Sequence, residues 1–86
     1  MKSVKMFILE SCPYCNQARK WMQELRQENP QYSDVKIEMI DEAIRPDIAN
    51  EYDYYYVPTY YIDDEKVHEG VANKEIIRQV FEKALE

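Results

Sequence analysis

The strongest constraint on the fold of this chain is the segment Ser-Cys-Pro-Tyr-Cys at residues 11–15, which holds both of its cysteines. Residues 4–9 before it form a nearly unbroken apolar run, which is typical of a buried strand. After it, apolar side chains recur at helical spacing at Ala18, Trp21, Met22 and Leu25. Pro13 suits the first helical position, because its missing N–H costs nothing there and its fixed φ fits a helix. The pattern predicts that Cys12 lies where a strand ends and a helix begins.

Two cysteines separated by two residues have the spacing of a redox-active dithiol. The thiolate is the reactive form, and a helix N-terminus favours negative charge because it offers unpaired N–H groups and the positive end of the helix dipole. Cys12 would meet that end directly. Cys15 follows one turn later on the same helix face and should be the more buried sulfur. We therefore predict that Cys12 attacks a partner disulfide and that Cys15 resolves the mixed disulfide.

Other roles for the cysteine pair fit the sequence less well. A structural disulfide would close only a tiny loop and would restrict little of the unfolded chain. A zinc site needs about four ligands, and the only further soft candidate is His68, which we expect to be an exposed residue of a short strand. We therefore assign no metal ligands. Two alternatives stay open: a metal or iron–sulfur dimer held by one thiolate pair from each subunit, and a binding module with inert thiols.

Composition and charge exclude several classes of function. The chain has 86 residues, enough for one small domain spanning residues 1–86, and a net charge of −6 that argues against a nucleic-acid partner. No stretch approaches the ~20 apolar residues that cross a bilayer. Residues 1–5 lead into only a few apolar residues before Glu10, too few for a signal peptide. We therefore expect a cytoplasmic monomer that contacts no membrane. In the reducing cytoplasm, such a cysteine pair is more often catalytic or metal-binding than structural.

The rest of the chain predicts an α/β fold. Residues 35–41 alternate in polarity, as expected of a half-buried edge strand whose apolar positions are Val35, Ile37 and Met39. Pro46 should begin a short helix, residues 60–62 a third strand and residues 66–69 a fourth, and Asn73 should cap a last helix. The order βαβαββα gives a four-stranded mixed sheet with three helices, in which the first two strands are parallel and the last two form a hairpin. A ligand site is expected at the carboxyl end of the first strand, where the cysteine pair lies.

Six of the eight tyrosines fall within residues 52–61. Stacked aromatic side chains can bind nucleic-acid bases, but the acidic charge and the lack of interleaved basic residues argue against that role. We expect these tyrosines to pack in the core and to form a rim around the cysteine pair. Tyr14, between the two cysteines, is the tyrosine that we expect to touch a substrate.

Three features together carry a family resemblance: Cys12-Pro13-Tyr14-Cys15 directly after a strand, the order of the elements, and Val57-Pro58-Thr59 before a strand. With these features the chain resembles a dithiol glutaredoxin over essentially its whole length. The resemblance implies a thioredoxin/glutaredoxin-like fold with Pro58 in the cis form beside the cysteines. It also implies that the backbone of Val57 pairs with a bound peptide or glutathione like an added strand. The implied substrate-binding residues are Pro13, Tyr14, Val57 and Pro58.

The departures from the glutaredoxin pattern concern glutathione. Glutaredoxins usually carry a lysine three residues before the first cysteine, where this chain has Leu9 followed by Glu10. Their Gly-Gly pair and the acid that follows are replaced by Glu-Gly-Val-Ala-Asn at residues 69–73, with a single glycine. Residues 6–9 also lack the acid that thioredoxins bury in this strand. The resemblance thus implies a chain intermediate between the two families.

We therefore expect a protein-disulfide reductase, an electron carrier that is itself reduced by a flavoprotein of the thioredoxin-reductase type. Its partners would be disulfide-containing proteins. It would hold no bound cofactor, and glutathione would be a weak co-substrate. The alternative within the same chemistry is a conventional glutathione-dependent glutaredoxin.

Overall fold

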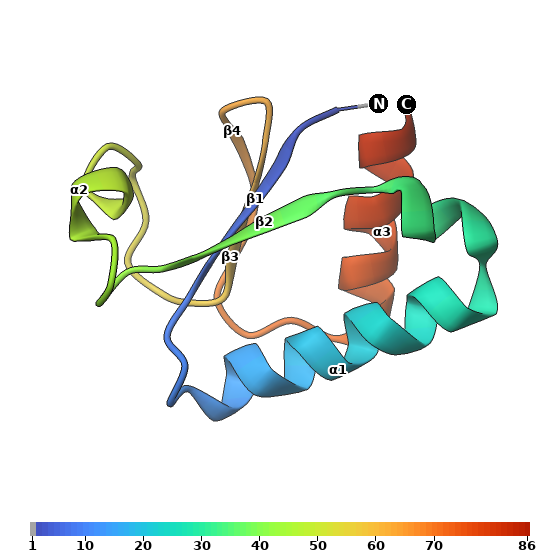
Figure 1. Cartoon of the computed structure of the whole chain (residues 1–86), viewed down its shortest axis with the longest axis horizontal. Helices are drawn as coiled ribbons and strands as arrows, with labels where there is room; N and C mark the ends of the chain where they lie inside the picture. Colours follow the sequence, from blue (N-terminus) through green and yellow to red (C-terminus); the bar gives the residue numbers. More distant parts are fainter. Residues whose placement is uncertain (1) are drawn as a thin grey trace.

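Four strands form one mixed sheet in the order β2-β1-β3-β4 in the computed structural model, which describes residues 2–86 (Figure 1). The strands are β1 (Val4–Ile8), β2 (Ile37–Asp41), β3 (Thr59–Ile62) and β4 (Glu65–Glu69). The helices are α1 (Pro13–Glu28), α2 (Pro46–Ala49) and α3 (Lys74–Leu85), with a short 3-10 helix, η1, at Pro30–Asp34. β1 pairs in parallel with β2, and the other two pairings are antiparallel. The expected fold class is confirmed.

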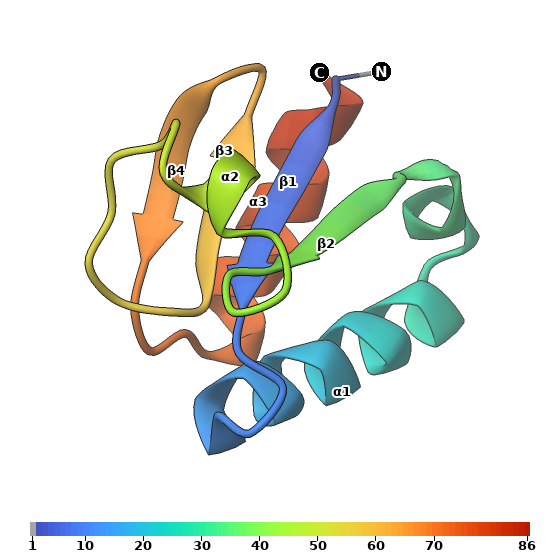
Figure 2. The ribbon, with the colours of Figure 1, turned by 60° about the vertical axis from the view of Figure 1, so that its left-hand side comes forward.

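The two faces of the sheet are covered by different helices. Figures 1 and 2 show α1 and α3 on one face and α2 on the other. The face under α1 and α3 receives three side chains of β1: Val4, Met6 and Ile8. On the α2 face a smaller cluster forms from Phe7, Ile40, Ala49 and Tyr61. Because side chains alternate along a strand, β1 is buried on both faces, and this explains its nearly unbroken apolar sequence.

The helices begin and end at the expected local signals. Pro13 is the first residue of α1 and Cys12 its N-cap; α1 ends at Glu28, and the chain continues as η1 from Pro30. Asn73 caps α3, because its side chain accepts a hydrogen bond from the N–H of Ile76 at 2.8 Å. None of the helices in the described part of the chain combines the length and the apolar character that crossing a bilayer requires.

β2 is an edge strand, as expected, but the predicted assignment of its faces is wrong in part. The strand begins at Ile37, and Val35 is fully buried at the end of η1 before it. Met39, which the alternation predicts to be buried, is 45% exposed, whereas Ile40 is buried. The reason is that Met39 lines an open pocket between α1 and the sheet edge, while Ile40 packs under α2.

His68 is half-buried in β4, so the expectation of an exposed histidine is wrong. Its Nε2 lies 3.2 Å from the carbonyl oxygen of Gly70 and 3.1 Å from that of Val71. Gly70 adopts a φ of 92°, which glycine reaches without the steric cost that a side chain would bring. The turn after β4 therefore brings two backbone carbonyls to the imidazole ring, which leaves the ring partly exposed.

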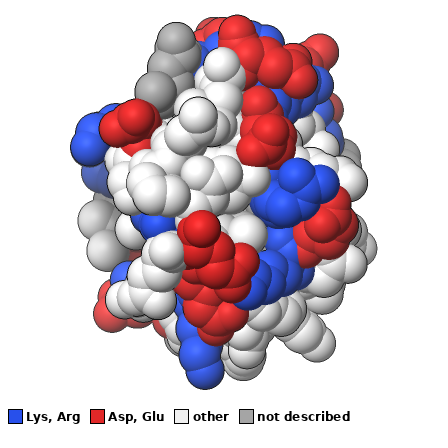
Figure 3. Space-filling view, turned by 90° about the vertical axis from the view of Figure 1, so that its right-hand side faces the viewer, with Lys and Arg blue, Asp and Glu red and all other residues white. Residues whose placement is uncertain are grey.

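Charged side chains of both signs are mixed on the face at the right of Figure 1, as the space-filling view in Figure 3 shows. Two of the ion pairs of the structure join α3 to α1. Lys74 contacts Glu24 at 3.2 Å and Glu28 at 2.5 Å. The ammonium group of Lys74 is therefore engaged by carboxylates of the neighbouring helix.

Phe7 connects β1 to the tyrosines of the α2 face. Its ring is fully buried, with its centroid 4.9 Å from that of Tyr52, 4.8 Å from Tyr54 and 5.8 Å from Tyr61. We predict that Phe7→Ala lowers the free energy of unfolding by about 3–5 kcal/mol, because it leaves a cavity among three rings. Urea denaturation measures the loss. Met39→Ala, on the neighbouring strand, is the control and should cost far less; equal losses in the two variants would contradict the central place of Phe7.

Candidate active site

A short turn leads from the end of β1 into α1 (Figure 2). Cys12 is the N-cap residue of that helix. Cys12 has extended backbone angles, φ −81° and ψ 117°, and its carbonyl accepts a hydrogen bond from the N–H of Asn16 at 3.1 Å. Its own N–H donates to the carbonyl of Leu9 at 3.0 Å and closes the turn. The Cys12 side chain makes no capping hydrogen bond. The N–H groups of the first helical turn are therefore available to stabilise a negative charge on its sulfur.

The two cysteines are free thiols that differ in exposure. Cys12 is half-buried, whereas Cys15 has no exposed surface. The pKa of the Cys15 thiol is raised to about 12, chiefly because burial disfavours its thiolate. A hydrogen bond with the Leu9 backbone acts in the opposite direction, and the interaction with the Cys12 sulfur raises the pKa further. Cys15 therefore keeps its proton at neutral pH, and Cys12 is the sulfur that a partner can reach.

The segment before β3 lies beside the end of β1. The sheet register pairs Thr59 with Phe7, so Val57 and Pro58 continue alongside the strand end from which the chain runs to Cys12. The Val57–Pro58 peptide bond is cis, as the family resemblance implies. Neither the N–H nor the C=O of Val57 makes a hydrogen bond within residues 2–86. Both groups are therefore available to pair with the backbone of a bound polypeptide.

A carboxylate from β4 fixes residues 52–57, which we call the tyrosine loop. Glu69 Oε2 accepts hydrogen bonds from the N–H groups of Tyr55 at 2.6 Å and Tyr56 at 3.0 Å. Its Oε1 accepts from Lys66 Nζ at 2.7 Å, and Lys66 also donates to the carbonyl of Asp53 at 3.1 Å. These contacts lower the pKa of Glu69 to about 2; the hydrogen bond with Lys66 has the largest effect and that with the Tyr55 N–H the second largest. The loop backbone is thereby held, while the side chains of Tyr55 and Tyr56 stay 85% and 71% exposed.

A family model of the thioredoxin domain matches residues 2–82 of this sequence. The chain belongs to the thioredoxin domain family. Among curated proteins, this thioredoxin-domain chain is similar to the thioredoxin of Methanocaldococcus jannaschii, with 29% identity over 82 residues that cover 95% of this chain and 94% of that protein. The family is one of thioredoxin-like oxidoreductases. These matches confirm the superfamily that the sequence indicates, without separating thioredoxins from glutaredoxins.

Solved structures of thioredoxins share the fold of this thioredoxin-domain chain. The oxidised mitochondrial thioredoxin 3 of Saccharomyces cerevisiae has a TM-score of 0.72 and 25% identity, over 95% of this chain and 77% of that one. The oxidised thioredoxin of Plasmodium falciparum has a TM-score of 0.72 and 19% identity, over 95% of this chain and 79% of that one. Both likenesses confirm the four-stranded fold.

Of the predicted substrate-binding residues of this thioredoxin-domain chain, two lie between the cysteines on α1, and the β1–β3 register directs the other two toward the end of β1 that leads to the cysteines. Pro13 and Tyr14 are exposed on the first turn of α1, Tyr14 by 58%. Val57 is half-buried, and Pro58 is fully buried beneath it. Their contacts with a substrate stay a prediction. Nowhere in residues 2–86 do three or more His, Cys, Asp or Glu side chains gather as metal ligands.

Sequence reasoning misses two carboxylates near the site. Glu69 carries no local signal, because its contacts with the tyrosine loop join residues 13 and 14 positions apart. Glu42 has a weak signal, since it follows β2 directly and the carboxyl ends of parallel strands share one edge. Its N–H donates to the carbonyl of Ile8 at 3.0 Å, and its carboxylate accepts a hydrogen bond from Tyr54 at 2.9 Å. The charge of Glu42 also raises the pKa of Cys15, although its effect is smaller than those of burial and of the Cys12 sulfur.

The exposure of the two thiols predicts their order of alkylation. With substoichiometric iodoacetamide at pH 7, Cys12 should carry nearly all of the label, because Cys15 is buried and its pKa is raised to about 12. Mass spectrometry of the digested protein locates the label. The same reaction in urea is the control, in which both cysteines should react. Faster labelling of Cys15 in the folded protein would contradict the assignment of Cys12 as the nucleophile.

The Glu69 contacts predict a pH dependence of stability. The pKa of Glu69 falls from 4.5 to about 2 on folding, so folding favours the carboxylate. Its stabilising contribution is complete above pH 4.5 and is lost as the pH falls through about 2. We predict that Glu69→Gln is less stable than wild type at pH 7 and that the difference shrinks on acidification, as measured by thermal unfolding. The exposed Glu51→Gln is the control; the same pH dependence in both variants would contradict the role of Glu69.

Proposed function

We propose that this chain is a protein-disulfide reductase that works through the dithiol of Cys12 and Cys15. The observation that carries the proposal is the pairing of a reachable sulfur at a helix N-terminus with a fully buried sulfur one turn later. The first step of thiol–disulfide exchange needs a sulfur that a partner can approach. The second step needs a thiol that stays protected until the mixed disulfide has formed.

The proposed reaction has two steps. The Cys12 thiolate attacks one sulfur of the substrate disulfide, a bond between Cys12 and the substrate forms, and the other substrate sulfur leaves as a thiolate that takes up a proton. Cys15 then loses its proton and attacks the Cys12 sulfur, so that a Cys12–Cys15 disulfide forms and the second substrate thiol leaves. Two electrons and two protons pass to the substrate. A flavoprotein disulfide reductase supplies two electrons to restore the dithiol.

We propose a flavoprotein of the thioredoxin-reductase type as the electron donor, with glutathione as a weak co-substrate. Glutathione brings two carboxylates, and tight binding needs cations or unpaired donors near Cys12. Leu9 supplies no charge and Glu10 beside it is acidic. Lys74 is engaged by two glutamates of α1, and the side chain of Asn73 already caps α3. The net charge of −6 adds a general repulsion toward anions.

A conventional glutathione-dependent glutaredoxin is the second candidate. The Cys-Pro-Tyr-Cys tetrad favours it, as do the unpaired backbone groups of Val57, which can pair with a tripeptide as well as with a protein. For either candidate we propose a monomer that acts on protein disulfides in a reducing compartment, the cytoplasm.

Parallel turnover assays distinguish the two donors. Insulin reduction is measured with NADPH and thioredoxin reductase, and separately with glutathione, glutathione reductase and NADPH. We expect turnover with thioredoxin reductase to be at least roughly tenfold faster, because each missing charge-assisted contact with glutathione costs about 1.5–3 kcal/mol. Faster turnover with glutathione would favour the glutaredoxin alternative. Absence of insulin reduction in both assays and with dithiothreitol as donor would overturn the reductase function itself.

Two cysteine variants serve as matched controls for the mechanism. Cys15→Ser should accumulate a mixed disulfide with the substrate, because attack is intact and resolution is removed. Cys12→Ser should form no such adduct, and its buried thiol should be inert. Non-reducing gel electrophoresis detects the adduct. Equal activity in the two variants would contradict the division of roles.

A further inference from the structure

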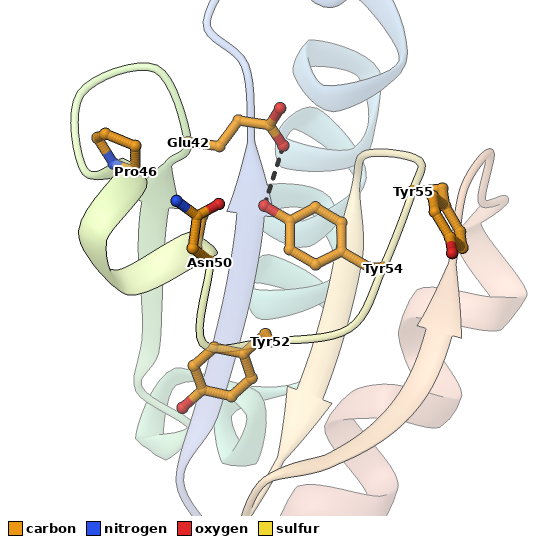
Figure 4. A pocket seen from close by; sticks show the side chains of 7 residues that line it. Glu42, Pro46, Asn50, Tyr52, Tyr54 and Tyr55 are labelled. Atoms are coloured by element: carbon orange, nitrogen blue, oxygen red, sulfur yellow. Dashed lines mark hydrogen bonds between the residues drawn. The ribbon is translucent and has the colours of Figure 1, made fainter.

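A cavity of about 250 Å³ lies on the α2 face of the sheet, and neither cysteine is among the residues that line it. Its walls come from the end of β2, from α2 and from the tyrosine loop: Glu42, Pro46, Ala49, Asn50, Tyr52, Tyr54 and Tyr55. Figure 4 shows the Glu42 carboxylate and the Tyr54 hydroxyl pointing toward one another, with Asn50 beside them. The cavity is therefore a polar recess with aromatic walls.

The walls of this cavity are preorganised. Phe7 stacks on Tyr54 with ring centroids 4.8 Å apart and lies 4.9 Å from Tyr52. The Tyr54 hydroxyl donates to Glu42 Oε1 at 2.9 Å. Burial is the largest cause that raises the pKa of Tyr54, and the hydrogen bond with Glu42 is the second. The phenol therefore keeps its proton and stays a donor. The other carboxylate oxygen, Oε2, receives no hydrogen bond within residues 2–86.

The lining selects a cation over other classes of ligand. An anion would face the Glu42 carboxylate, and neither lysine nor arginine lines the cavity. A metal ion would need several oxygen ligands, whereas the described residues contain no cluster of three or more ligating side chains. An apolar ligand would leave Oε2 of Glu42 without water or a donor. A guanidinium group satisfies the site, because it donates charge-assisted hydrogen bonds to Oε2 and packs its flat face on a tyrosine ring.

We propose that this cavity binds an arginine side chain of the substrate polypeptide. The inference rests on the proposed function, because it names a feature of the protein whose disulfide Cys12 attacks. The N–H of Glu42 donates to the carbonyl of Ile8 at 3.0 Å, so Glu42 lies at the same end of β1 from which the chain runs to Cys12. The net charge of −6 favours encounter with basic partners, and the cavity gives one basic side chain a fixed position.

Binding is tested on the reduced protein with two probes, N-acetyl-arginine amide and its neutral isostere N-acetyl-citrulline amide, while NMR follows the side-chain amide of Asn50. We expect a saturable shift with the arginine probe, none with the citrulline probe, and no shift in Glu42→Gln. Glu38→Gln is the matched control, because it removes the same charge from an exposed residue of β2 outside the cavity lining, and it should retain the shift. A shift that citrulline also produces, or that Glu42→Gln retains, would overturn the proposal.

The role of the cavity in substrate choice is tested by kinetics. Disulfide peptides with arginine on either side of the cysteine are compared with their citrulline counterparts, and the ratio of the two kcat/KM values is taken within each protein variant. We expect a ratio of roughly ten for wild type and Glu38→Gln, equivalent to about 1.4 kcal/mol, and of about one for Glu42→Gln. A ratio of about one in wild type would overturn the proposal. If wild type reduces neither peptide, the reductase function fails instead, and the NMR titration still decides whether arginine binds.

Discussion

The Cys15 thiol is buried where the end of β1 meets the first turn of α1, and the geometry of the site follows from keeping it there. Burial removes the water that would stabilise a thiolate, which is the largest cause of its raised pKa. Such burial requires a strand that is apolar on the face under α1 and a helix whose first turn packs on that face. Because α1 begins at Pro13, its third residue faces the core and Cys12 is left at the N-cap. One helix start therefore sets the exposure of both sulfurs.

On the opposite face, two carboxylates act together with the Phe7 ring to fix the tyrosine loop. Glu69 holds the backbone of the tyrosine loop, and Glu42 holds the hydroxyl of Tyr54. Phe7 links this face to the strand that leads to the cysteines, since its ring packs on two tyrosines of the loop. The loop thus gains a defined shape although its own exposed residues bury little surface. A preordered loop loses less conformational entropy when a partner binds, which favours recognition by this surface.

The parts of the fold and site that the sequence predicts are those with local causes. Pro13 marks the start of α1 and Asn73 that of α3, because proline and asparagine act on the backbone beside them. Met39 and His68 are misjudged, because their exposure depends on an open pocket beside α1 and on a turn that folds back after β4. Glu69 is missed for the same reason, since a carboxylate that binds backbone N–H groups of a distant loop looks like any other surface acid in the sequence.

The causes of the raised Cys15 pKa also give the two reaction steps an order. In the dithiol state, burial, the hydrogen bond with the Cys12 sulfur, the charge of that sulfur and the charge of Glu42 all hold the proton on Cys15. When Cys12 enters a mixed disulfide, its sulfur carries no charge and accepts hydrogen bonds poorly, so two of these causes disappear. For the proposed reaction we therefore expect Cys15 to give up its proton more easily in the mixed disulfide than in the dithiol. Attack by Cys12 would then activate the thiol that resolves the product, while burial keeps that thiol protonated in the dithiol protein.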